Sequence, residues 1–145
     1  NFLTLTKELS VLGADMILKS LDLIEKNLED FIEQDESEAT YARKIEKKES
    51  KIEWDTEANK VIAKINALYP NPGSWFEYKG SRLKIIKAVE VEANGRPGEI
   101  IDKKFIIACS KNAVQVLELQ KEGKKIVKVS EYLKGHILET GFNVS

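Results

Sequence analysis

Two predicted strands meet at a short turn within residues 74–92, whose sequence is SWFEYKGSRLKIIKAVEVE. Strands are predicted at residues 74–78 and 82–92, and the intervening Lys79-Gly80 is typical of a hairpin turn. The expected faces of the second strand are Leu83, Ile85, Val89 and Val91 on one side and Ile86 and Ala88 on the other. A long strand that is apolar on parts of both faces is expected where a sheet coils into a small barrel.

Further elements are predicted on both sides of this hairpin. Upstream, a helix with Asp55 or Thr56 as its N-cap precedes Pro70 and Pro72, which end it. Its buried stripe is expected to comprise Ala58, Val61, Ile62, Ile65 and Leu68. Downstream, strands are predicted at 99–101, 104–108 and 113–119, and a helical turn at 129–133. Five strands preceded by one helix indicate an α+β, mainly β fold with an OB-type β-barrel.

The N-terminal part of the chain has a different pattern. Apolar residues recur with the helical period over residues 3–28, at Leu5, Leu9, Leu12, Met16, Ile17, Leu21, Ile24 and Leu28. An acidic segment follows, and residues 40–51 contain five basic side chains but few large apolar ones, as expected of a surface linker. The predicted domains are therefore residues 1–39, a basic linker at 40–54, and a barrel domain at 55–145.

Composition excludes several classes of protein. The 145 residues are 42% apolar and 32% charged, which excludes a collagen or a fully disordered chain. No apolar run approaches the roughly 20 residues that span a bilayer, so no membrane association is expected. The single cysteine excludes an internal disulfide, and with one histidine it leaves no Cys/His zinc site. A reducing, cytoplasmic compartment is the simplest expectation.

The charge is distributed unevenly along the chain. Residues 1–40 contain three lysines and ten acidic side chains, a net of −7, whereas residues 41–145 have a net of +6. A basic part of this kind either meets a polyanion or only keeps the domain soluble. The candidate binding residues are Arg43, Lys44, Lys47, Lys48 and Lys51 in the linker, and Arg82, Lys84, Lys121, Lys124 and Lys125 in the barrel.

Other chemistry-bearing residues have simpler structural interpretations. Trp54 is expected to anchor the helix on the barrel, and at most one of Trp75 and Phe76 is fully buried because they occupy opposite strand faces. Cys109 follows an apolar strand and is expected in the core, and His136 is expected at the surface. The sequence therefore predicts no catalytic residue and no metal ligand.

An ordered set of short motifs resembles the linker and C-terminal domain of the methionyl-tRNA formyltransferases. The pieces occur in family order with family-like spacing: Thr40-Tyr41-Ala42, Lys51-Ile52-Glu53-Trp54, Pro70-Asn71-Pro72-Gly73, Pro97-Gly98-Glu99-Ile100, Gly123-Lys124-Lys125 and Tyr132-Leu133-Lys134-Gly135. The upstream helix with Leu12-Gly13-Ala14 looks like the end of the catalytic domain of that family. Asn71 and Glu53 depart from the usual tryptophan and aspartate, without consequence for the fold.

The resemblance implies a fragment of an enzyme that transfers a formyl group from 10-formyltetrahydrofolate to initiator methionyl-tRNA. The fragment would bind the tRNA through the basic residues named above, would hold no cofactor, and would be inactive alone because the catalytic domain is missing. One alternative is the barrel of a sugar-nucleotide or folate-hydrolysing formyltransferase, and another is a free-standing nucleic-acid-binding barrel. Self-association through the exposed N-terminal helix is also expected.

Overall fold

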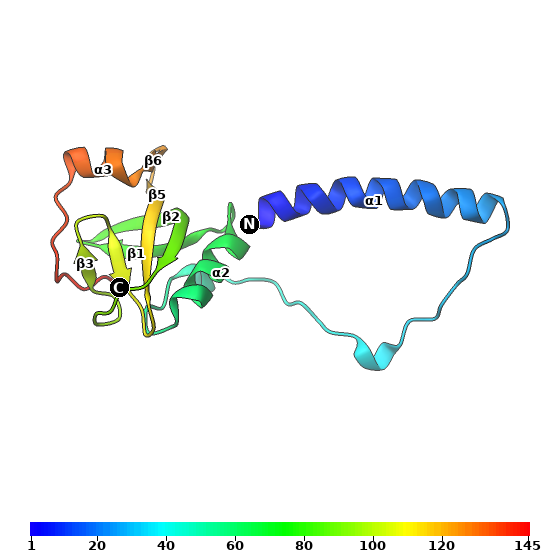
Figure 1. The fold of residues 1–145 in the computed structure, drawn as a ribbon, viewed down its shortest axis with the longest axis horizontal. Helices are drawn as coiled ribbons and strands as arrows, with labels where there is room; N and C mark the ends of the chain where they lie inside the picture. Colours follow the sequence, from blue (N-terminus) through cyan, green and yellow to red (C-terminus); the bar gives the residue numbers. More distant parts are fainter. The chain divides into compact units, whose positions relative to one another are not determined.

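The computed structural model describes all residues from Asn1 to Ser145 and divides them into two compact units, residues 3–45 and residues 46–145, with residues 1–2 grouped with the latter. The first unit contains helix α1 (Phe2–Glu25) and a single 3-10 turn, η1 (Glu36–Glu38) (Figure 1). This confirms the predicted amphipathic helix. None of its residues is buried in the structure. No helix of the protein combines the length and the apolar character that crossing a bilayer requires.

The second unit, which we call the sheet unit, is an antiparallel six-stranded sheet with two helices. The strands are β1 (Ser74–Tyr78), β2 (Ser81–Val91), β3 (Ile100–Asp102), β4 (Ile106–Ala108), β5 (Ala113–Lys121) and β6 (Ile126–Lys128). They pair in the order β1-β2-β5-β4-β3, and β6 pairs with β5. Helix α2 (Ala58–Leu68) packs on β1, β2 and β5, and α3 (Val129–Gly135) packs on β5 and β6 (Figure 1).

The five predicted strands are all present, and the sixth was missed. Strand β6 has only three residues, Ile126, Val127 and Lys128, which are too few for an apolar–polar alternation to be recognised in the sequence. It forms because the turn at Gly123 brings it back onto β5, with Leu119 opposite Val127. Pairing with a neighbour, which is a tertiary property, therefore defines this strand.

The residues of β2 that face the core switch from odd to even positions half-way along the strand. Leu83 and Ile85 are buried, but Val89 is 40% exposed, so the prediction that Val89 shares their face was wrong. The pairing of β2 with β5 shifts between Ile85 and Lys87 and again before Ala88. The second shift cancels the first, so the register is the same on both sides of this irregularity (the bulge in β2), and both strands change face there: Val116 and Leu119, three positions apart on β5, are both buried. Ala88 consequently packs against the core in place of Val89.

Helix α2 begins later than predicted. Its N-cap is Glu57, which makes no capping hydrogen bond through its side chain, so the assignment of Asp55 or Thr56 as N-cap was wrong. The first helical N–H, at Ala58, donates instead to the carbonyl oxygen of Lys111, 3.1 Å away. The helix start is thus satisfied by a loop distant in sequence. The predicted stripe is otherwise confirmed, with Ala58, Val61, Ile65 and Leu68 buried and Ile62 partly buried.

Residues 46–54, the second half of the predicted linker, pack into the sheet unit. A 3-10 turn, η2 (Lys47–Ser50), leads into a short parallel bridge between Lys51 and Trp75. Ile52 donates its N–H to the carbonyl oxygen of Trp75 at 2.8 Å, and Ile52 and Trp54 are 2% and 5% exposed. Residues 39–45 form neither helix nor strand.

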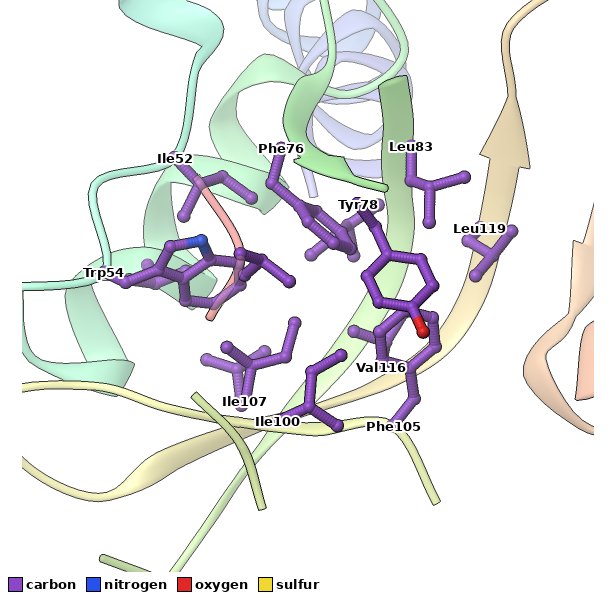
Figure 2. Packing of buried hydrophobic residues seen from close by; sticks show 14 of the residues in the cluster. Ile52, Trp54, Phe76, Tyr78, Leu83, Ile100, Phe105, Ile107, Val116 and Leu119 are labelled. Carbon is purple, nitrogen blue, oxygen red and sulfur yellow. The ribbon is translucent and has the colours of Figure 1, made fainter. Parts of the chain in front are cut away.

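The core is centred on edge-to-face aromatic contacts (Figure 2). Phe76 contacts the ring of Trp54 at a centroid distance of 5.6 Å and that of Phe105 at 5.9 Å. Such pairs stabilise a core beyond the apolar area they bury. Trp54 is buried in the same cluster as Val61 and Ile65 of α2, which agrees with its expected place between helix and barrel. Of Trp75 and Phe76, only Phe76 is fully buried, as predicted.

The last residues of the chain connect the two edges of the sheet. Strand pairing leaves β1 and β3 unjoined. On the β3 side, Ile100 donates its N–H to Phe142 at 2.9 Å, and Val144 donates to Gly98 at 2.8 Å. On the β1 side, the backbone of Ser145 bonds to that of Glu77. The segment 141–145 thereby covers otherwise unpaired backbone groups at both edges.

The bulge in β2 leads to a direct test by substitution. Leu83→Ala should lower the free energy of unfolding by about 2–5 kcal/mol, because it empties a fully buried site. Val89→Ala should lower it by less than about 1 kcal/mol, because this side chain is already partly in solvent. Urea denaturation of both variants measures the difference. Equal costs would show that Val89 faces the core and that the bulge is misplaced.

Candidate nucleic-acid interface

A basic groove lies on the outer face of the β1–β2 hairpin. Its volume is about 720 Å³, and its walls come from η2, the turn before β1, both strands of the hairpin and the end of β5. Five basic side chains line it against one acidic side chain, Glu122. The basic residues are Lys47, Lys48, Arg82, Lys84 and Lys121. Basic groups converging on one concave surface provide the electrostatic footprint of a polyanion site.

The hairpin register brings Trp75 and Arg82 together. Lys79 and Gly80 both have positive φ, as a two-residue turn that matches strand twist requires, and they pair Tyr78 with Ser81. Trp75 then lies opposite Lys84 and diagonal to Arg82 on the outer face. The guanidinium carbon of Arg82 lies 3.8 Å from the centre of the Trp75 ring. This stack holds the arginine side chain in place while its N–H donors remain available at the edges.

The side chain of Lys84 lies against Gly73. A Cβ atom on Gly73 would lie 2.6 Å from Cδ of Lys84, which is closer than such atoms approach. Gly73 also has φ of +78°, in the left-handed region that favours glycine. The left-handed φ is the stronger reason for glycine here, because the Lys84 atoms that approach it belong to the flexible end of a side chain and can move aside.

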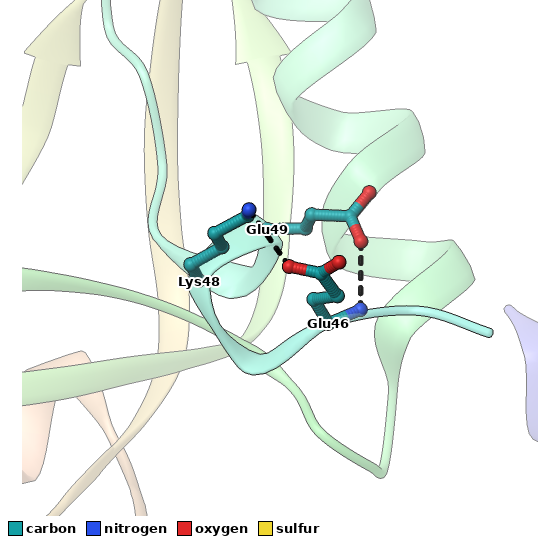
Figure 3. A network of polar contacts seen from close by, with 3 residues as sticks. All are labelled: Glu46, Lys48 and Glu49. Atoms are coloured by element: carbon teal, nitrogen blue, oxygen red, sulfur yellow. Dashed lines mark hydrogen bonds and ion pairs between the residues drawn. The ribbon is translucent and has the colours of Figure 1, made fainter.

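The η2 turn contributes Lys47 and Lys48 to the wall of the groove. Figure 3 shows the polar contacts of Glu46, Lys48 and Glu49 at this turn. The carboxylate of Glu49 accepts a hydrogen bond from the N–H of Glu46 at 2.7 Å, which closes the turn. Nζ of Lys48 lies 2.8 Å from the carboxylate of Glu46, and both side chains are more than half exposed. Exposed pairs of this kind contribute little stability. A phosphate can therefore replace Glu46 as the partner of Lys48 at small cost.

The other predicted residues lie at different places. Lys124 and Lys125 line a second, smaller cavity, which Lys121 also borders. Nζ of Lys51 is 5.7 Å from the centre of the Trp75 ring, beside the groove, and the Lys51 carbonyl oxygen accepts from Nζ of Lys64 at 2.6 Å. Arg43 and Lys44 belong to the unit of residues 3–45, whereas the residues of the groove belong to the sheet unit. Their role in binding remains a prediction.

Trp75 lines the groove although it was not among the binding residues predicted from the sequence. Trp54, Phe76 and Tyr78 are core residues as expected, but Trp75 is only partly buried and lines the groove. The signal was present in the sequence, because the two-residue turn fixes the pairing of every residue in the hairpin. Counting back from Lys79-Gly80 puts Trp75 on the same face as Arg82 and Lys84.

Several charged or reactive groups have structural partners outside the groove. Lys79 pairs with Glu139 at 2.8 Å, and this hydrogen-bonded contact raises the pKa of the lysine. Hydrogen bonds from Ser37 lower the pKa of Asp35 in the acidic segment. Cys109 is buried as predicted, and His136 is exposed. The structure gathers no three His, Cys, Asp or Glu side chains in an arrangement suited to a metal ion.

The groove lies in a part of the chain that matches a known protein family. The family model described as the formyl transferase C-terminal domain matches residues 44–137. The chain belongs to this family. The matched range includes every residue that lines the groove.

Curated relatives extend the similarity to nearly the whole chain. The methionyl-tRNA formyltransferase of Pelagibacter ubique (strain HTCC1062) is 36% identical over 143 residues, which are 98% of this chain and 46% of that protein. The enzyme of the same name from Bradyrhizobium diazoefficiens is 36% identical over 137 residues, or 92% of this chain and 44% of the relative. The chain thus spans less than half the length of these relatives.

Solved structures show the same fold. A variant of HypX from Aquifex aeolicus superposes with a TM-score of 0.61 over 86% of this chain and 24% of HypX, at 22% identity. The complex of HypX with tetrahydrofolic acid gives a TM-score of 0.60 over 82% of this chain and 22% of HypX, at 21% identity. At this identity the likeness concerns the fold alone.

The buried thiol provides a test of the core beside β4. Burial raises the pKa of Cys109 from 9.0 to about 11, and the charge of Glu90 adds to the effect. At pH 8 the thiolate should therefore be roughly 100-fold scarcer in the native chain than in the unfolded one. Labelling of this single cysteine by iodoacetamide should be slower by at least that factor in buffer than in urea. Mass spectrometry measures the rates, and similar rates would contradict the burial.

The same group makes stability depend on pH. Because the folded-state pKa lies above the unfolded value, the contribution of the thiol is fully present below pH 9 and is lost as pH rises towards 11. A Cys109→Ala variant, which lacks the thiol, should not show this part of the decline.

Proposed function

We propose that this chain is the tRNA-binding part of a methionyl-tRNA formyltransferase. The observation that carries the proposal is the basic groove around Trp75, present in a chain that is 36% identical to proteins of that name. The whole protein would transfer the formyl group of 10-formyltetrahydrofolate to initiator methionyl-tRNA. The contribution of this chain would be affinity and orientation, which hold the aminoacyl end in reach of the reacting groups.

Phosphate contacts would supply the affinity. Each lysine or arginine that neutralises a phosphate releases condensed counterions, so the gain is entropic and depends on salt. Lys47, Lys48 and Lys121 act as mobile point charges, whereas Arg82 is held against Trp75 and offers a planar fork of donors. Arg82 therefore loses less side-chain freedom on binding phosphate than a free arginine does, and we expect its removal to cost the most.

The architecture supports the same use. We propose that the sheet unit is a barrel of the OB type, because the sheet coils through the bulge in β2 and the segment 141–145 bonds to both edge strands. Barrels of this type present one face to oligonucleotides. We further propose a cytoplasmic location, for which the single buried, unpaired cysteine is the supporting observation.

The binding role can be tested by titrating initiator tRNA over a salt series. The affinity should fall steeply with salt, and Arg82→Ala should reduce the log–log slope by roughly 0.7–0.9, the share of one phosphate. Lys60→Ala, which removes an exposed lysine outside the groove, is the control and should leave the slope unchanged. Fluorescence anisotropy of labelled tRNA measures both.

Three outcomes would contradict the proposal. Absence of tRNA binding even at low salt would leave the groove without this ligand. Tighter binding of a sugar nucleotide than of tRNA would favour a formyltransferase that acts on sugar nucleotides. Equal losses for Arg82→Ala and Lys60→Ala would mean that binding depends on total charge and not on the groove.

We also propose that a second copy of the chain covers α1 at high concentration. Leu5, Leu9, Leu12 and Met16 recur at helical spacing and are each more than half exposed. Sedimentation should show an average mass that rises with concentration. Leu12→Glu should abolish the rise, and Lys7→Glu, on the opposite side of the helix, should not. A monomer at all concentrations would contradict the proposal.

A further inference from the structure

A column of stacked rings runs from the core to the surface beside α3. The ring of Tyr132 stacks on that of the buried Phe105, with centroids 6.2 Å apart and planes inclined by 23°. The imidazole of His136 stacks in turn on Tyr132, with centroids 4.1 Å apart and planes only 4° from parallel. Residues 132 and 136 are neighbours on one helical face because they are four positions apart. His136 is exposed and forms the outer end of the column.

A hydrogen bond also holds the imidazole of His136. Its Nδ1 lies 3.0 Å from the carbonyl oxygen of Tyr132. A carbonyl oxygen can only accept, so Nδ1 must carry the proton of this bond. An exposed side chain that is held by both a stack and a hydrogen bond is already ordered before any ligand arrives.

The second cavity lies beside this column. Its volume is about 370 Å³, within the usual range for small-ligand sites. Leu119, Val127 and Tyr132 contribute apolar surface, while Lys121, Lys124 and Lys125 contribute positive charge. The only acidic residue among its walls, Glu131, is engaged with Nζ of Lys134 at 2.9 Å. We call this cavity the His136 pocket.

We propose that the His136 pocket binds one unpaired nucleotide of an RNA strand. The base extends the ring column by stacking on the outer face of His136, and the phosphate contacts Lys124 and Lys125. A flat ring with an attached anion suits this combination of aromatic and cationic surfaces, and stacking of single-stranded bases on aromatic side chains is tolerant of sequence. A site that contacted only a phosphate backbone would need neither the apolar wall nor the stacked imidazole.

The position of the pocket favours a strand over a free nucleotide. Lys121 lines both the basic groove and the His136 pocket, so the two sites share a wall. A strand whose backbone follows the groove can therefore place a neighbouring unpaired nucleotide in the pocket. The inference rests on the proposed RNA-binding function, and it adds a second site that recognises an unpaired base.

The chain contains a single histidine, which gives the test a specific signal. The full chain is titrated with pentaadenylate RNA and, separately, with adenosine monophosphate, and the imidazole C–H resonances are followed by NMR. Stacking of adenine should move the His136 ring protons upfield. His136→Ala should weaken pentaadenylate binding by about 5- to 100-fold, as expected for loss of one stacked base. His136→Phe, which keeps a ring there, should stay within about 3-fold of the native chain.

Further variants separate the pocket from general charge. Lys124→Ala should weaken pentaadenylate binding, whereas Lys103→Ala, an exposed lysine outside both cavities, should not. Unmoved His136 signals at saturating pentaadenylate would overturn the proposal. Equal affinities for adenosine monophosphate and pentaadenylate would assign the pocket to free nucleotides and overturn its assignment to a strand.

Failure of this inference is distinguishable from failure of the proposed function. If Arg82→Ala weakens tRNA binding while the His136 signals stay unmoved, the groove binds tRNA and the pocket has no part in it. If neither response occurs, both proposals fail.

Discussion

The two-residue turn at Lys79 and Gly80 sets the register on which both the core and the groove depend. With Tyr78 paired to Ser81, the inner face of the hairpin presents Phe76 and Leu83 to the core. The outer face of the same two strands presents Trp75, Lys84 and Arg82. A slip of one residue would exchange the two faces, placing charged side chains in the core and aromatic ones in solvent. Stability and the candidate function are therefore tied to one local constraint.

Aromatic packing extends this constraint across the sheet unit. Phe76 contacts Trp54 on one side and Phe105 on the other, and Phe105 in turn supports Tyr132. These aromatic rings thereby connect three parts of the sheet unit: the segment before α2, the β3–β4 turn and helix α3. The rigidity of the exposed imidazole of His136 derives from this buried chain of contacts.

Much of the fold follows from local patterns, and the exceptions share one cause. The period of α1, the stripe of α2 and the strands around the hairpin were predictable because each depends on neighbours in sequence. The exposure of Val89 and the existence of β6 were not, because both depend on how β5 pairs with its neighbours. The start of α2 likewise depends on the carbonyl of Lys111, more than fifty residues away.

Local patterns in the chain were enough to identify the family resemblance, the basic residues from which a polyanion site could be built, and every helix and strand except β6. That Lys47, Arg82 and Lys121 share one groove while Lys124 lines another cavity depends on how the strands pair and pack in the folded protein. The tertiary structure also decided that Trp75 orders Arg82 and that Glu46, rather than a groove residue, pairs with Lys48. The physical reason is that charge and periodicity are properties of the chain, whereas a site requires side chains from distant segments to converge.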